Sequence, residues 1–218
     1  MTVSLTSLKQ SLHAGLTAVA QGADPALIYH SNAQLWASHP FNQLQGLEAI
    51  RRVWSQLRYA LPDMQRRDQI FVAGNSKADA RMPDDLEGRV LVASMGHYQG
   101  SFVNDLCGIP ATHGVVNLRV CEVHHLVEGK IAQSYVLLDL LDLMGQAGYW
   151  PIAPSLGAEG MWSGPATNDG VRLHTSDPSG GQTAFDTVIA MHNALGSFDG
   201  KSLDSMQHGA YWADNFLW

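Results

Sequence analysis

The stretch from Gly96 to Gly148, GHYQGSFVNDLCGIPATHGVVNLRVCEVHHLVEGKIAQSYVLLDLLDLMGQAG, decides the fold of this chain. Two runs of apolar and β-branched residues, Val115–Val127 and Ile131–Leu138, have the composition of strands. Glu128-Gly129-Lys130 separates them and has the composition of a tight turn. The pair therefore predicts a long, curved antiparallel hairpin.

The residues on either side of this hairpin also have local signatures. A turn rich in Gly and Pro, residues 108–114, precedes the first strand. Asp139 opens a short apolar helix after the second strand, and Gly148 ends it. Farther out, apolar periodicity predicts helices and further strands. The helices are Leu5–Ala20, Ala26–Ala37 and Leu47–Ala60, the strands are Gln69–Ala73 and Arg89–Tyr98, and a polar loop covers Asn75–Gly88.

This ordered series resembles the C-terminal half of the SnoaL-like polyketide cyclase family, within the nuclear-transport-factor-two-like superfamily. The family pattern runs G-x-H-x-G, G-I-P-x-T-G, a strand, x-D-G-K-I, a strand that ends E-H-W-D, and an L-L-x-Q-x-G helix. A thinner similarity upstream extends the resemblance to residues 24–149. It implies an α+β fold for residues 1–149, in which a cone-shaped, curved antiparallel sheet packs against N-terminal helices and leaves a pocket at one end.

Composition limits the classes of partner. The net charge of −7 and only 13 Lys and Arg argue against a nucleic-acid surface. No apolar run approaches the length of a membrane span, and the N-terminus lacks the pattern of an export signal. The two cysteines, Cys107 and Cys121, offer no disulfide framework, so the sequence predicts a reduced, cytoplasmic protein without a membrane partner.

The composition changes after Gly148. Residues 150–182 are rich in Pro and Gly and predict an extended linker arm. Residues 183–218 predict a helical segment, with helices at Ala184–Leu195 and Leu203–Phe216. This segment is interpreted either as the start of a second, incomplete SnoaL-like module or as helices that pack on the first module or on a partner subunit.

In the best-known cyclases of this family, the last strand carries a His and an Asp in E-H-W-D, and the Asp acts as general acid/base in an intramolecular aldol ring closure. At the aligned positions this chain has Gln133-Ser134-Tyr135-Val136, so Ser134 and Val136 replace the family His and Asp. Because valine cannot exchange a proton, that mechanism does not transfer at this position. Two functions stay open. The first is a cofactor-independent cyclase or isomerase that acts on an apolar ketone or ester by acid/base chemistry, and the second is a non-catalytic small-molecule-binding or dimerisation module.

Strand alternation supplies candidate catalytic residues. Glu122 and His124 share one face of their strand and form a plausible acid/base unit, although a polar, half-exposed outer face would show the same pattern. Tyr98 aligns with the family His of G-x-H-x-G and could donate a hydrogen bond to a ligand, or could be a core residue. Asp139 is interpreted as a catalytic carboxylate or as a helix N-cap.

The remaining candidates come from the helical region. His39 precedes a proline, at a place where the resemblance implies a pocket-directed His. Trp36 and Trp54 are interpreted as pocket walls for an apolar ligand or as core residues, and Ser134 and Val136 as ligand-binding positions. No metal site and no cofactor are predicted, because neither a metal-ligand spacing nor a nucleotide-binding motif is found. The expected partners are a small apolar molecule and a second copy of the chain in a homodimer.

Overall fold

The computed structural model describes residues 4–77, 87–154, 164, 167–175 and 177–213. The chain forms two compact units, Met1–Leu173 and His174–Trp218, so most of the predicted arm belongs to the first unit. No helix among the described residues is long and apolar enough to cross a membrane.

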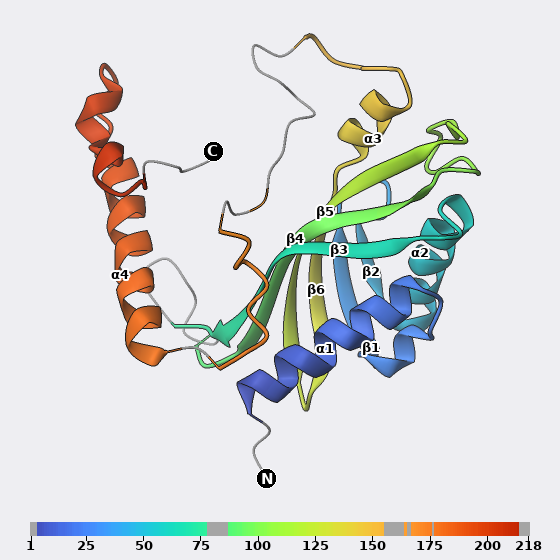
Figure 1. The fold of residues 1–218 in the computed structure, drawn as a ribbon, viewed down its shortest axis with the longest axis horizontal. Coiled ribbons are helices and arrows are strands. Elements are labelled where there is room, and N and C mark those ends of the chain that lie inside the picture. Colours follow the sequence, from blue (N-terminus) through green and yellow to red (C-terminus); the bar gives the residue numbers. More distant parts are fainter. Residues whose placement is uncertain (1–3, 78–86, 155–163, 165–166, 176, 214–218) are drawn as a thin grey trace. The chain divides into compact units, whose positions relative to one another are not determined.

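A curved sheet forms the frame of the first unit (Figure 1). Its strand order is β2-β1-β6-β5-β4-β3, and neighbouring strands are antiparallel except for the parallel pair β1 and β6. The predicted hairpin is confirmed, as is the α+β cone with its strongly bent sheet. The strands are β1 (Tyr29–Ala37), β2 (Gln43–Gln45), β3 (Gln65–Asn75), β4 (Val90–Ser101), β5 (Val115–Val127) and β6 (Lys130–Leu138).

Two amphipathic helices, α1 (Leu5–Ala20) and α2 (Leu47–Ala60), contribute to one hydrophobic core with the inner face of this sheet. The Ser4 side chain caps α1 by accepting a hydrogen bond from the Ser7 N–H. Apolar residues spaced three and four apart, including Leu12, Leu16 and Val19, are buried along one side of α1. Both helices have the bounds that apolar periodicity predicts.

The predicted helix Ala26–Ala37 is wrong. Pro25–Leu27 forms a short 3-10 helix, and β1 follows it. The residues of β1 have weak helix propensity, with Ser31 and Asn32 in sequence, and β1 has a register shift between Tyr29 and Gln34. This irregularity interrupts the alternation of buried and exposed residues that is typical of a strand. Pairing with β6, some hundred residues away, decides the structure.

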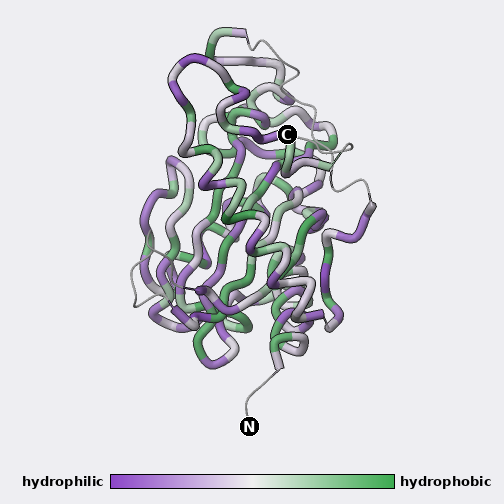
Figure 2. Tube along the Cα trace, turned by 90° about the vertical axis from the view of Figure 1, so that its left-hand side faces the viewer, coloured by the Kyte–Doolittle hydropathy of each residue, from purple (hydrophilic) through white to green (hydrophobic). Residues whose placement is uncertain are grey.

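Figure 2 shows apolar and hydrophilic residues following one another along the strands. On β5 every even-numbered residue from Val116 to Leu126 is buried, whereas the odd-numbered residues are exposed or half-buried. The even-numbered face therefore lies against the helices, and the odd-numbered face is the outer, convex face. A short helix, α3 (Leu140–Gln146), follows β6, as predicted.

The second unit contains α4 (Pro178–Leu195), which includes the predicted helix Ala184–Leu195. The predicted helix Leu203–Phe216 is wrong within the described residues, since Leu203–Met206 and His208–Ala210 are 3-10 helices separated by Gln207 in a left-handed conformation. Residues 214–216 lie outside the described part of the chain. The first unit also begins with an α-helix that is followed by a 3-10 helix. The two 3-10 helices are capped alike: the Asp24 side chain accepts a hydrogen bond from the Ala26 N–H, and the Ser202 side chain accepts one from the Asp204 N–H.

Candidate functional site

The inner face of the sheet carries a cluster of polar side chains at its centre. Glu122 and His124 come from β5, Tyr98 from β4 and Ser134 from β6, and each is at most 2% exposed. The register of the strands brings them together, because Glu122 lies opposite Ser94 and His124 lies opposite Ser134. Four of the residues singled out in the sequence thus meet in one buried place.

Arg66 of β3 holds this cluster together. Its Nη1 lies 2.6 Å from Glu122 Oε2, and its Nη2 lies 2.8 Å from Asp68 Oδ1. Arg66 also donates to the Tyr98 hydroxyl at 3.2 Å and to Ser94 Oγ at 2.7 Å. A single guanidinium therefore contacts two buried carboxylates and two hydroxyls, which suits its fixed fork of donors.

Glu122 has partners at both carboxylate oxygens. The Tyr98 hydroxyl donates to Oε1 at 2.7 Å, and Ser94 donates to Oε2 at 3.0 Å. Burial by itself would raise the pKa of Glu122, but Arg66, His124 and the Tyr98 hydroxyl together hold that pKa well below its ordinary value. Burial and the negative charge of Glu122 raise the pKa of Tyr98 well above its ordinary value. Glu122 is thus ionised and Tyr98 protonated over the neutral pH range.

His124 joins the cluster from the next buried position on β5. Its Nδ1 lies 2.8 Å from Ser134 Oγ, and its Nε2 lies 3.7 Å from Glu122 Oε2 without a hydrogen-bond partner. Burial and Glu122 raise the pKa of the neighbouring Tyr29 hydroxyl. Among the atoms of this cluster, His124 Nε2 and Asp68 Oδ1 are buried without a hydrogen-bond partner, although Asp68 Oδ1 forms an ion pair with Arg66.

The cluster reaches toward solvent through α1. His13 Nε2 lies 3.2 Å from Asp68 Oδ2, and the His13 side chain is 27% exposed whereas that of Asp68 is 4% exposed. The His13 ring also meets the Phe71 ring edge-on, with centroids 4.9 Å apart. His13 therefore lies at the boundary between the buried charges and the surface.

The space beside this cluster is small. A cavity of about 20 Å³ is bounded by Glu122, Tyr98, Trp54, Val136 and other apolar side chains. The Trp54 ring packs edge-on against Tyr98, with centroids 5.7 Å apart. This cavity has room for about one water molecule.

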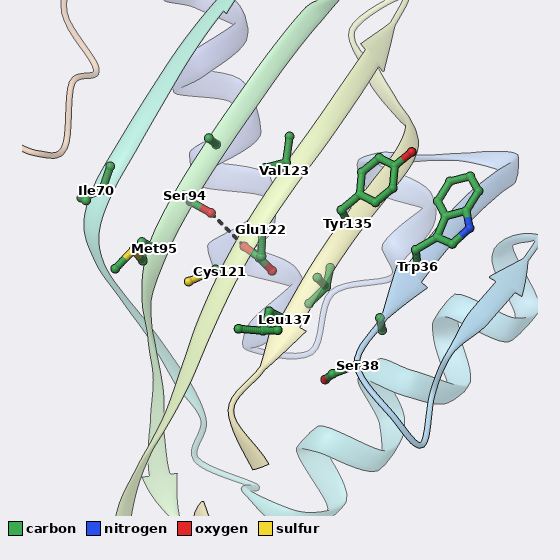
Figure 3. A pocket seen from close by; sticks show the side chains of 13 residues that line it. Trp36, Ser38, Ile70, Ser94, Met95, Cys121, Glu122, Val123, Tyr135 and Leu137 are labelled. Carbon is green, nitrogen blue, oxygen red and sulfur yellow. Dashed lines mark hydrogen bonds between the residues drawn. The ribbon is translucent and has the colours of Figure 1, made fainter. Parts of the chain in front are cut away.

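A larger hollow lies on the convex face of the sheet. It is an open groove of about 580 Å³ with apolar side chains from several strands, among them Ile70, Met95 and Leu137 (Figure 3). Trp36 and Tyr135 border it, and their rings stack with centroids 5.0 Å apart. Val123, Tyr135 and Leu137 are 38%, 52% and 58% exposed, so this face carries exposed apolar side chains among the described residues of the first unit.

The predicted site residues divide between these places. Tyr98, Glu122, His124 and Ser134 form the buried cluster, while Trp54 and Val136 border the small cavity beside it. Glu122 and Val136 also border the convex groove. Trp36 lies on the convex face instead of facing the interior.

Two further candidates lie away from the cluster. His39 is exposed in the turn after β1, so the structure does not bring it to Tyr98. Asp139 caps α3 by accepting from the Asp142 N–H at 3.0 Å, and its Oδ2 lies 3.4 Å from Arg119 Nη1. The capping interpretation accounts for Asp139 without catalysis.

Sequence reasoning missed Arg66, Asp68 and Tyr29. Arg66 lies in a sequence stretch rich in arginine, which is typical of a solvated face, yet it lies on β3 and is 8% exposed. A signal was present in the sequence: a strand that carries Glu122 at a buried position needs a buried cation from a neighbouring element. Among the described residues, no group of three or more His, Cys, Asp and Glu side chains is arranged to hold a metal ion.

Comparisons with known proteins agree with this fold. No protein-family model and no curated protein matches the sequence. IdmH of Streptomyces antibioticus, a candidate polyketide cyclase, has a TM-score of 0.51 at 16% identity, over 65% of this chain and 99% of its own. AclR of Streptomyces galilaeus, a candidate hydroxylase, has a TM-score of 0.51 at 15% identity, over 69% of this chain and 87% of its own.

A candidate SnoaL-like polyketide cyclase of Jannaschia species CCS1 has a TM-score of 0.48 at 15% identity, over 69% of this chain and 99% of its own. The resemblance drawn from the sequence is thereby confirmed at the level of the fold. The N-terminal unit is similar in fold to polyketide cyclases.

Proposed function

We propose that the N-terminal unit is a non-catalytic assembly module that pairs with a second copy of the chain through the convex groove. The observation that carries this proposal is the small size of the cavity beside Glu122. The cavity beside Glu122 measures about 20 Å³, whereas small-molecule sites usually measure about 300–1,000 Å³. A ketone or ester of polyketide size does not fit there.

The chemistry of the buried cluster supports the same proposal. A general base works best when its pKa lies near the working pH, but the pKa of Glu122 is held well below its ordinary value. The Tyr98 hydroxyl donates to Glu122, so its proton is already engaged. Val136 stands where the SnoaL-like family has its acid. Glu122 and Arg66 act as a structural ion pair in this proposal.

The convex groove has the composition of a protein interface. Aromatic side chains and Met are enriched at interfaces, and Trp36, Tyr135 and Met95 all border this groove. The exposed side chains of Val123, Tyr135 and Leu137 lie on this face, and contiguous exposed apolar patches commonly mark interaction surfaces. A two-fold axis would place the same groove of each copy against the other, which requires one self-complementary surface.

Charge substitution in the groove tests this function. Leu137→Lys places a charge in the proposed interface, and sedimentation velocity should show a monomer because a desolvated, unpaired lysine is costly. Val115→Lys is the matched control, since Val115 is 69% exposed and lies on β5 outside the groove. If Leu137→Lys and Val115→Lys sediment alike, the convex groove is not the interface.

A second candidate function is an acid/base enzyme that acts on an apolar ketone or ester. It is favoured by His124 Nε2, a buried atom without a hydrogen-bond partner that lies 3.7 Å from Glu122 Oε2. In this case Tyr98→Phe and His124→Gln should weaken ligand binding and leave the fold intact. Thermal melts beside ligand titrations separate the cases, because a lower Tm with unchanged affinity assigns both residues to structure.

A further inference from the structure

The free edge of the sheet carries a feature that the proposed function does not use. β3 is the last strand in the sheet order, so its outer edge has no neighbouring strand of the sheet. Exposed edges of this kind pair readily with other chains, and proteins commonly cover or interrupt them. Residues 167–173, which we term the strap, lie along this edge.

The strap pairs with β3 at one residue. The Phe71 N–H donates to the Gly170 carbonyl at 2.8 Å, and the Arg172 N–H donates to the Phe71 carbonyl at 2.8 Å. Phe71 and Val171 form a parallel bridge. Both backbone groups of Phe71 thus point away from β4 and are satisfied by the strap, as in the addition of a strand to a sheet edge.

Side chains hold the strap in this place. Val171 and Leu173 are partly buried against the core of the first unit. Gln10 of α1 donates from its Nε2 to the Leu173 carbonyl at 3.2 Å. The strap therefore joins the edge strand to the helix that covers the inner face.

Phe71 is central to this region. Its side chain is fully buried, and its ring contacts His13 edge-on. Its backbone is nevertheless the part of β3 that the strap covers. Losing the strap would expose a polar edge directly beside the core.

We propose that the outer edge of β3 is a docking strand for extended segments. The strap occupies that edge in cis and so prevents the β3 edges of two copies from pairing. The occupant is the chain's own segment 167–173, and the competitor is β3 of a second copy. This edge association is separate from the pairing proposed for the convex groove.

The test removes one backbone donor of the strap. Arg172→Pro eliminates the N–H that donates to the Phe71 carbonyl, and Arg172→Ala is the matched control that keeps it. Both are made in the Leu137→Lys background, so that groove pairing does not contribute. Measured at a dilution at which sedimentation shows a monomer, hydrogen exchange of the Phe71 amide should become roughly tenfold faster or more in Arg172→Pro and stay unchanged in Arg172→Ala. Sedimentation of Arg172→Pro should show concentration-dependent association.

Leu173→Asp provides a second variant if Arg172→Pro does not fold. It removes an apolar anchor of the strap and keeps every backbone N–H, and it should produce the same two changes. Unchanged protection of the Phe71 amide in the folded variant would overturn the docking proposal. Faster exchange without association would overturn its protective role. Neither result bears on the groove, because the comparison of Leu137→Lys with Val115→Lys by sedimentation tests that surface.

Discussion

Arg66 and Glu122, on β3 and β5, form an ion pair with 2.6 Å between Nη1 and Oε2, although β4 separates their strands. Their side chains are 1% and 2% exposed. Burying two charges costs several kcal/mol per ion, which their attraction and hydrogen bonds have to offset. The pair accordingly depends on the Ser94 and Tyr98 hydroxyls that surround it.

Removing the negative partner should be costly. Glu122→Gln leaves Arg66 buried with Asp68 as its remaining carboxylate, and the free energy of unfolding should fall by about 3–5 kcal/mol. Urea denaturation followed by circular dichroism measures this change. Glu128→Gln in the exposed β5–β6 turn is the control and should be nearly neutral. A loss below about 1 kcal/mol for Glu122→Gln would contradict the structural role of the pair.

Low pH should destabilise the fold through the carboxylate of Glu122. The pKa of Glu122 in the folded state lies well below its ordinary value of 4.5, so its contribution to stability is complete above that value. The contribution is lost as the pH falls from 4.5 toward the folded-state pKa. Urea midpoints measured down this range should decline less steeply for Glu122→Gln than for the parent chain. Parallel curves would assign the acid sensitivity to other groups.

Tyr98→Phe should measure how much the Tyr98 hydroxyl, apart from its ring, contributes to the free energy of unfolding. It removes the donor to Glu122 Oε1 and an acceptor for Arg66, at a cost of about 1–3 kcal/mol. Trp54→Ala, which removes a whole ring from the same core, should cost about 3–5 kcal/mol. Thermal or urea unfolding compares the two variants. Equal losses would mean that the Tyr98 hydroxyl carries more of the stability than its contacts indicate.

The alkylation rates of the two cysteines test whether the convex groove is covered in solution. Cys121 borders the groove, whereas Cys107 is exposed elsewhere. Burial raises the pKa of both thiols, so differences in access should dominate their relative labelling. Alkylation followed by mass spectrometry should show slow reaction of Cys121 in the parent chain and faster reaction in Leu137→Lys. Cys107 should react at one rate in both, and a Cys121 rate that ignores Leu137→Lys would count against the groove as an interface.

Local patterns were enough for some of the fold. The hairpin of β5 and β6 follows from strand composition and turn chemistry, and the helices α1 and α2 follow from apolar periodicity. These are all short-range signals. β1 was not predictable in this way, because a distant partner, β6, and a register shift determine it.

The candidate site likewise contains residues that local patterns predict and residues whose place depends on distant strand pairing. Alternation on β5 put Glu122 and His124 on one face, and the structure confirms that they share it. Arg66 was missed because only the register across β3, β4 and β5 brings its guanidinium to Glu122. His39 was expected at the pocket from the resemblance, and a turn holds it at the surface.

The mass of the parent chain in solution tests the central claim most directly. Multi-angle light scattering at micromolar concentration should give twice the chain mass of 23.7 kDa, with a shift to the single-chain mass in Leu137→Lys. The small cavity beside Glu122 and the open convex groove together predict that result. A parent chain that stays at 23.7 kDa at this concentration would contradict the account.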